Sequence, residues 1–349
     1  MTFPLALPAP PHIDPRKAPA LRWGILGPGI IAADLVAALL AHTGQEVVAV
    51  GSRSRDRARS FAERFGIDRA YGSYEELVAD PGVDAIYVAT PMSEHYAQTL
   101  LCIEAGKPTL VEKSFTRTAA EAREVQRRAV EAGVFVMEAM KTRYLPQMQI
   151  IDQLLGDGVL GTIDSVVAQY GVVTPYQPQH RLFDPILGGG VLLDIGVYPL
   201  SLAFTLLGEF SSAHASGTLA PSGVEDAVSA LLTTSTGSRA LINASWRGEA
   251  PVRADIGGSL NRVELGESFQ NPAPLSLVSP DRRRRLEWDD QRFPGRAGMV
   301  FQVAAMARYL EAGLTESPLH SLSDSVAVMA LLDELRHQVG SQFDDERQR

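Results

Sequence analysis

Residues 24–32 read Gly24-Ile25-Leu26-Gly27-Pro28-Gly29-Ile30-Ile31-Ala32, and this stretch decides the fold. A strand candidate, 21–26, leads into it, and a helix candidate, 30–40, follows it. Gly27 permits the tight turn, Gly29 lets backbone approach a pyrophosphate, and the small Ala32 lets the helix pack on the strand. Ile30 and Ile31 open a helix whose free N–H groups suit phosphate. A strand before and a helix after the glycines favour a dinucleotide-binding loop over a tight turn without a ligand.

Strands and helices alternate around this stretch as far as about residue 143. Further strand candidates are 47–50, 85–88, 109–111 and 134–137, and the helix candidates between them are 56–65, 94–105 and 119–132. Such alternation predicts a parallel sheet with helices on both faces, a Rossmann domain. Beyond Tyr144, after a helix candidate at 146–155, apolar and polar residues alternate along 163–173, 224–234 and 239–246. This second pattern predicts an α/β domain with a large, mostly antiparallel open sheet.

The predicted division of the chain is therefore a flexible N-terminal arm (1–20), a Rossmann domain (21–143), a substrate and dimerisation domain (144–318) and a C-terminal segment (319–349). The last segment contains a helix that we expect to pack back on the Rossmann domain. The outer face of an open sheet needs a cover. A second subunit is a reasonable one, so we expect a homodimer, or a dimer of dimers, built through this sheet.

Bulk composition excludes several classes of function. The 349 residues carry a formal net charge of −9, which disfavours nucleic acid as a partner. No apolar run is long enough to span a bilayer, and Cys102 is the single cysteine, which indicates a reducing, cytoplasmic location. The seven histidines lack metal-ligand spacing, so no metal is expected. A small-molecule substrate remains.

The end of the second strand predicts which dinucleotide binds. NAD sites usually place a carboxylate there, whereas this chain has Gly51-Ser52-Arg53-Ser54-Arg55. A serine and an arginine suit the 2′-phosphate of NADP(H), and Arg57 follows within reach. We therefore expect NADP(H) rather than NAD(H). The alternative is that the arginines of this segment only form a solvated helix face.

Two segments supply residues for hydride-transfer chemistry, which needs a proton donor and positive charge near a developing alkoxide. Lys113 follows a predicted parallel strand, at the edge where such sheets bind ligands. Asp194 and Tyr198 are four residues apart, after Gly188-Gly189-Gly190, so one helical turn would place both on one face, although Pro199 complicates a regular helix. The alternatives are a surface lysine paired with Glu112, a capping aspartate and a packed tyrosine.

In this order, the segments resemble the glucose-fructose oxidoreductase and inositol dehydrogenase family (Gfo/Idh/MocA). Arg181-Leu182-Phe183-Asp184-Pro185, before the glycines, is most similar to the dihydrodiol dehydrogenase and D-xylose 1-dehydrogenase branch. The resemblance implies that Lys113 is the catalytic lysine, that Tyr198 is the acid/base whose pKa Lys113 lowers, and that Asp194 is its companion. It also implies cofactor contacts by Ala89, Thr90, Pro91, His95, Glu112 and Lys113, and substrate contacts by Lys113, Arg143, Phe183, Asp194 and Tyr198.

The implied activity is hydride transfer between nicotinamide and a CH–OH group of a sugar, polyol, dihydrodiol or ketosugar. Ser114 stands where the family usually has proline, so Lys113 could be held less rigidly. Lys141 stands where relatives often carry an aromatic or apolar residue; facing the pocket, it would suit a polar or anionic substrate. A catalytically inactive NADP-binding regulator of the same fold is the alternative. A lyase or epimerase without net cofactor turnover is a third reading.

Overall fold

The computed structural model describes residues 3–10 and 14–343, and it contains two compact units. One unit comprises the described residues of 13–144 together with 296–329. The other comprises the described residues of 1–12, 145–295 and 330–349. Within the described residues, no helix combines the length and the apolar character that crossing a membrane requires.

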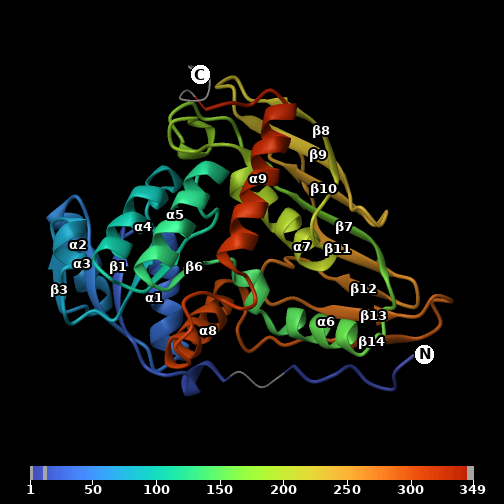
Figure 1. The fold of residues 1–349 in the computed structure, drawn as a ribbon, viewed down its shortest axis with the longest axis horizontal. Helices are drawn as coiled ribbons and strands as arrows, with labels where there is room; N and C mark the ends of the chain where they lie inside the picture. The colour runs from blue at the N-terminus through green and yellow to red at the C-terminus, as the bar shows by residue number, and fades with distance from the viewer. Residues whose placement is uncertain (1–2, 11–13, 344–349) are drawn as a thin grey trace. The chain divides into compact units, whose positions relative to one another are not determined.

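The unit around residues 24–32 is built on a six-stranded parallel sheet in the order β3-β2-β1-β4-β5-β6 (Figure 1). Its strands are β1 (Arg22–Leu26), β2 (Glu46–Gly51), β3 (Arg69–Tyr71), β4 (Ala85–Val88), β5 (Thr109–Val111) and β6 (Val136–Glu138). Its helices are α1 (Ile30–His42), α2 (Arg55–Phe65), α3 (Tyr74–Val78), α4 (His95–Glu104), α5 (Ala119–Ala132) and α8 (Val300–Glu311). The predicted Rossmann fold is confirmed.

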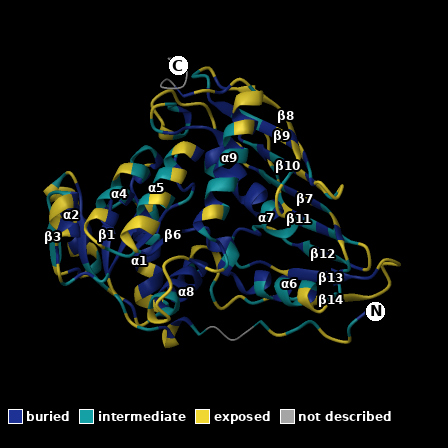
Figure 2. Ribbon diagram, in the orientation of Figure 1, coloured by how far each residue is buried: buried dark blue, intermediate teal, exposed yellow. Residues whose placement is uncertain are grey.

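Local sequence explains where these helices begin and end. The side chains of Ser54, Ser73 and Thr118 accept the N–H three residues on at the starts of α2, α3 and α5. Gly66 and Gly133 end α2 and α5 in the left-handed conformation, which glycine adopts without strain. Figure 2 shows the resulting amphipathic helices, such as α2, which turns an exposed face outward, and the buried strand β1.

The second unit is built on an eight-stranded sheet in the order β14-β13-β12-β11-β7-β10-β9-β8 (Figure 1). Its strands are β7 (Ile163–Gly171), β8 (Ser212–Leu219), β9 (Glu225–Thr233), β10 (Arg239–Ser245), β11 (Ala250–Gly258), β12 (Arg262–Leu265), β13 (Leu275–Val278) and β14 (Arg285–Trp288). Every pair is antiparallel except β7 with β10, as predicted for a mostly antiparallel sheet. Helices α6 (Pro146–Gly156) and α7 (Val197–Leu207) complete the unit, and α7 packs on β7 and β10.

The two units contain segments that the sequence assigned elsewhere. Residues 296–329 group with the Rossmann unit, because α8 packs against α1 and the 3-10 turn Lys141–Tyr144. Helix α9 (Leu322–Gln338) begins in that unit and ends in the sheet unit. In the predicted flexible arm, Phe3 is buried under the Arg284 guanidinium and Ala18 packs against α8, whereas Leu5 is fully exposed. Residues 1–2 and 11–13 of the arm, and 344–349 of the C-terminal segment, lie outside the described residues.

Candidate active site

The predicted nucleotide loop follows β1 and has the geometry of a phosphate cradle. Gly27 has φ +98°, and a Cβ there would lie 3.0 Å from the Ala89 oxygen and 3.0 Å from the Thr90 nitrogen, so a side chain is excluded. Gly29 is the N-cap residue of α1, and it makes no side-chain hydrogen bond to the first turn of the helix. The first N–H groups of α1 therefore have no side-chain acceptor and suit a phosphate. Ile30, in the same turn, is 80% exposed, whereas Ile31 is partly buried.

At the end of β2, the structure separates the serine from the arginines. Ser52 is buried and accepts the Ser54 N–H at 3.2 Å. The Arg53 side chain is 69% exposed, with Nη1 3.8 Å from a Glu94 oxygen, and Arg57 is exposed on the first turn of α2. Arg55 binds Glu76 at 3.1 Å instead. Arg53 and Arg57 are therefore both exposed near the end of β2, whereas Arg55 is paired with Glu76.

The segment after β4 contributes polar groups beside the nucleotide loop. Ala89 and Thr90 are buried, whereas Pro91 is exposed. The hydroxyls of Thr90 and Ser93 are buried without a hydrogen-bond partner among the described residues. Buried hydroxyls normally have partners, so these two fit a ligand that brings its own polar groups. Together with the uncapped helix, they show that the loop fits a dinucleotide.

His95, predicted to line the cofactor, joins the segments after β4 and β5. Its Nε2 lies 3.1 Å from the Thr90 oxygen, and its Nδ1 lies 2.9 Å from the Ser114 oxygen. The ring is 2% exposed, and burial lowers its pKa, because the charged imidazolium loses its water. His95 therefore fixes the backbone on the C-terminal side of Lys113.

Lys113 lies just beyond β5, beside two buried ionisable groups. Glu112 accepts a hydrogen bond from the Tyr87 hydroxyl and one from the Lys113 N–H at 3.3 Å, and burial raises its pKa. The Lys113–Ser114 peptide bond is cis. Lys141, beyond the neighbouring strand β6, is 7% exposed. Burial lowers the pKa of Lys141 to about 8, and the positive charge of Lys113 contributes to that shift.

Arg143 is engaged by backbone within its own unit. Its Nε and Nη2 donate to the Leu319 oxygen at 3.1 and 2.9 Å, while Nη1 is buried without a partner among the described residues. These contacts hold the segment before α9. We therefore leave Arg143 out of the proposed substrate site.

In the sheet unit, Asp194 lies in a π-helical turn, Leu192–Gly196, that runs into α7. The predicted α-helical turn from Asp194 to Tyr198 is therefore a junction of π and α turns. Pro199 gives the reason: it has no N–H, and its ring would clash with the Ile195 carbonyl in a continuous α-helix. Asp194 lies 3.9 Å from the Arg181 guanidinium.

The buried Glu225 side chain packs against the turn that carries Asp194. The Glu225 side chain, at the start of β9, accepts the Leu192 N–H at 3.2 Å. A Cβ on Gly190 would lie 2.3 Å from the Glu225 carboxylate, so the carboxylate packs directly on the glycine. Burial raises the pKa of Glu225, while the Ser341 hydroxyl and the Arg336 guanidinium oppose the shift. Residues near the C-terminus thus reach the turn that carries Asp194.

Aromatic rings surround the two other predicted residues of this unit. Tyr198 is 9% exposed and stacks on Tyr170, with ring centroids 6.1 Å apart. Phe183 is 2% exposed and meets Tyr176 and Trp246 edge-on at 5.1 Å each. Sequence reasoning missed Glu94, Glu225 and Tyr170, because nothing in their own neighbourhood indicates their partners. Among the described residues, no group of His, Cys, Asp and Glu could hold a metal.

Comparisons with known proteins identify relatives along almost the whole chain. A family model described as an oxidoreductase family with an NAD-binding Rossmann fold matches residues 21–140, and the GFO/IDH/MocA C-terminal domain model matches 148–264. The trans-1,2-dihydrobenzene-1,2-diol dehydrogenases of Mus musculus and Homo sapiens are 34% and 33% identical. Each alignment covers 94% of this chain and 99% of the relative.

Solved structures share the fold. KijD10, a 3-ketoreductase from Actinomadura kijaniata in complex with NADP and TDP-benzene, matches with a TM-score of 0.78 and 30% identity. The match covers 92% of this chain and 98% of KijD10. Levoglucosan dehydrogenase, in complex with NADH and levoglucosan, matches with a TM-score of 0.83 at 20% identity over 92% of this chain and 97% of that enzyme.

Proposed function

The chain belongs to the Gfo/Idh/MocA oxidoreductase family, and we propose that it is an NADP(H)-dependent dehydrogenase of a dihydrodiol or a sugar-like polyol or ketosugar. The cradle of Gly27 and the uncapped start of α1 is the observation that carries cofactor binding. The exposed Arg53 at the end of β2 supports the 2′-phosphate, and NADP is bound in the related KijD10. Identity to the dihydrodiol dehydrogenases over nearly their full length supports the substrate class.

The residues of this chain would divide the chemistry as follows. NADP(H), when bound, supplies or accepts the hydride. Lys113 supplies positive charge to the substrate oxygen as negative charge develops there. The Tyr198 hydroxyl exchanges the proton with that oxygen, and Asp194 acts as the companion of Tyr198. His95 and Glu112 hold the backbone around Lys113.

Substitution tests these roles. We expect Lys113→Ala and Tyr198→Phe each to lower kcat about 100-fold or more, because general acid–base catalysts and oxyanion donors contribute that much. The dissociation constant for NADPH should change little. The assay follows NADPH absorbance with a panel of dihydrodiols, aldoses, inositols and nucleotide-linked ketosugars. Tyr309→Phe, which removes a hydroxyl from α8, is the matched control and should keep wild-type turnover.

Two outcomes would contradict this proposal. Wild-type turnover in both variants would remove Lys113 and Tyr198 from the mechanism. Absence of hydride transfer with every substrate, despite NADPH binding, would favour the inactive regulator instead.

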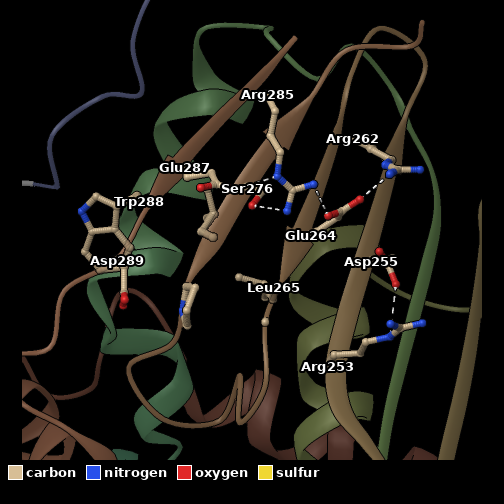
Figure 3. Close-up of a pocket in the computed structure, with 13 residues that line it drawn as sticks. Arg253, Asp255, Arg262, Glu264, Leu265, Ser276, Arg285, Glu287, Trp288 and Asp289 are labelled. Carbon is tan, nitrogen blue, oxygen red and sulfur yellow. Dashed lines mark hydrogen bonds and ion pairs between the residues drawn. The ribbon is translucent and has the colours of Figure 1, made fainter. Parts of the chain in front are cut away.

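We further propose that a second copy covers the outer face of the eight-stranded sheet. On β7, β9 and β10 this face exposes Val167, Leu231 and Leu241, each more than 40% exposed. On β11–β14 it carries ion pairs, shown in Figure 3, such as Arg285 with Glu264 at 2.8 Å. A two-fold interface sets the same patch against itself, which buries the apolar part and lets charges of both signs pair across it.

Oligomeric state tests this cover. Leu241→Glu should convert dimers to monomers in light scattering after size-exclusion chromatography, because it buries charges in an apolar interface. Leu314→Glu, at a leucine of the Rossmann unit that is 40% exposed against 47% for Leu241, should leave the dimer intact. A monomeric wild-type protein would refute the proposal.

A further inference from the structure

A carboxylate from a separate segment lies beside the arginine at the end of β2. Glu94 belongs to the 3-10 turn Met92–Glu94 that follows β4, and one of its oxygens is 3.8 Å from Arg53 Nη1. The Glu94 side chain is 32% exposed, and that of Arg53 is 69% exposed. Tyr74, at the start of α3, lies in the same group: burial raises its pKa, and the charge and hydrogen bond of Arg53 oppose the shift.

The sheet order places this pair at the nucleotide loop. Strand β1 lies between β2 and β4, so a contact from the end of β2 to the turn after β4 passes across the end of β1. Gly27 and Gly29 begin the phosphate cradle at that end. In dinucleotide-binding folds, the adenosine ribose lies at the end of the second strand. The Arg53–Glu94 pair therefore lies where the ribose 2′ substituent arrives.

We propose that Glu94 is a specificity-determining residue that lets this chain bind both NADPH and NADH, an inference that rests on the proposed function. A 2′-phosphate must take Arg53 from Glu94 and remain near a like charge, which weakens NADPH binding. A 2′-hydroxyl donates to the Glu94 carboxylate, as it does to the acidic residue that NAD sites carry at the end of the second strand. Glu94 thus supplies, from another loop, the acceptor that the end of β2 lacks.

The expected effect of Glu94 on nucleotide binding differs from that of an ordinary surface ion pair. The loss of an ordinary exposed ion pair changes stability little and affects all ligands alike. Competition for Arg53 instead makes the two nucleotides respond in opposite directions. The charge of Glu94 should matter for NADPH, and its acceptor oxygen should matter for NADH.

The experiment measures nucleotide binding without substrate, by titrating nucleotide fluorescence at fixed ionic strength. We expect Glu94→Gln to tighten NADPH binding about threefold to fivefold and to change NADH binding less than twofold, because the amide keeps an acceptor. Glu94→Ala should tighten NADPH binding similarly and weaken NADH binding about threefold to tenfold. Glu76→Gln, in the analogous exposed pair with Arg55, is the matched control and should change neither.

Three results would overturn the inference. NADPH binding that is unchanged or weaker in Glu94→Gln would exclude competition for Arg53. Changes of both nucleotides in the same direction in Glu94→Ala would make Glu94 only a structural residue. A wild-type protein that binds neither nucleotide would overturn the proposed cofactor itself, whereas loss of turnover with intact binding would affect only the proposed chemistry.

Discussion

The buried Lys141 makes a signed prediction about stability. Its pKa is lowered from 10.5 to about 8, chiefly by burial. Each pKa unit corresponds to about 1.4 kcal/mol, so at pH 7 the charged ammonium opposes folding by about 3 kcal/mol. Lys141→Met keeps most of the apolar stem and removes the charge. Because Glu112 then loses a nearby positive charge, we expect a net gain of about 1–3 kcal/mol in the free energy of unfolding at pH 7.

The pH dependence of that gain follows from linkage. A basic group with a depressed pKa stabilises the fold fully above its unfolded value, 10.5, and this stability is lost as the pH falls through about 8. The advantage of Lys141→Met should therefore be largest below pH 8 and vanish towards pH 10.5. Urea unfolding of both proteins at pH 7 to 10 measures it.

Lys107 provides the control for this experiment. Its ammonium donates to two backbone oxygens, of Asp80 and Val83, at 2.8 Å each. Lys107→Met should therefore destabilise the protein, because it leaves those oxygens without their donor. A Lys141→Met variant that is less stable than wild type at pH 7, or whose difference does not depend on pH, would refute the electrostatic reasoning. In that case the favourable interactions of the Lys141 ammonium in the folded protein outweigh the cost of burying its charge.

Two further predictions concern residues that position the site. Glu225→Gln weakens the acceptor of the Leu192 N–H, so we expect kcat to fall about fivefold or more with NADPH affinity unchanged. Asp226→Asn, on the same strand, should keep the wild-type kcat, and equal losses of kcat in both variants would contradict this prediction. The pKa of His95 is lowered from 6.5, so the stability that His95 provides is present above pH 6.5 and is lost as the pH falls further. Thermal unfolding from pH 8 to 5 should show that loss in the wild type and a flatter pH profile in His95→Gln. Parallel profiles would exclude His95 as the source of the loss.

Features that depend on local chain geometry could be predicted from the sequence. The turn at Gly27 has a positive φ, which glycine adopts readily, so the glycine itself predicts the turn. The alternation of strands and helices predicted the parallel sheet, and the later alternation of apolar and polar residues predicted the mostly antiparallel one. The junction at Asp194 shows the limit of such reasoning. Pro199 indicates an irregular helix, but the sequence does not say whether the chain kinks, ends or widens into the π turn that it forms.

Glu94 and Glu225 could not be recognised from the sequence, because each acts through segments distant in the chain. Glu225 begins an alternating strand, and only the fold buries it against Gly190 and near Arg336. A glutamate in that position is expected to face water, since burying a carboxylate is costly unless other groups compensate. Residues that carry chemistry fall in short motifs, since turns and strand ends expose them. Residues that hold them come from any segment that the fold brings near. For this chain, we therefore expect variants of Glu225 to change the rate, although Glu225 belongs to no recognisable motif. We expect variants of Glu94 to change the choice of nucleotide, although the motif around it points to Pro91 and His95 and not to Glu94 itself.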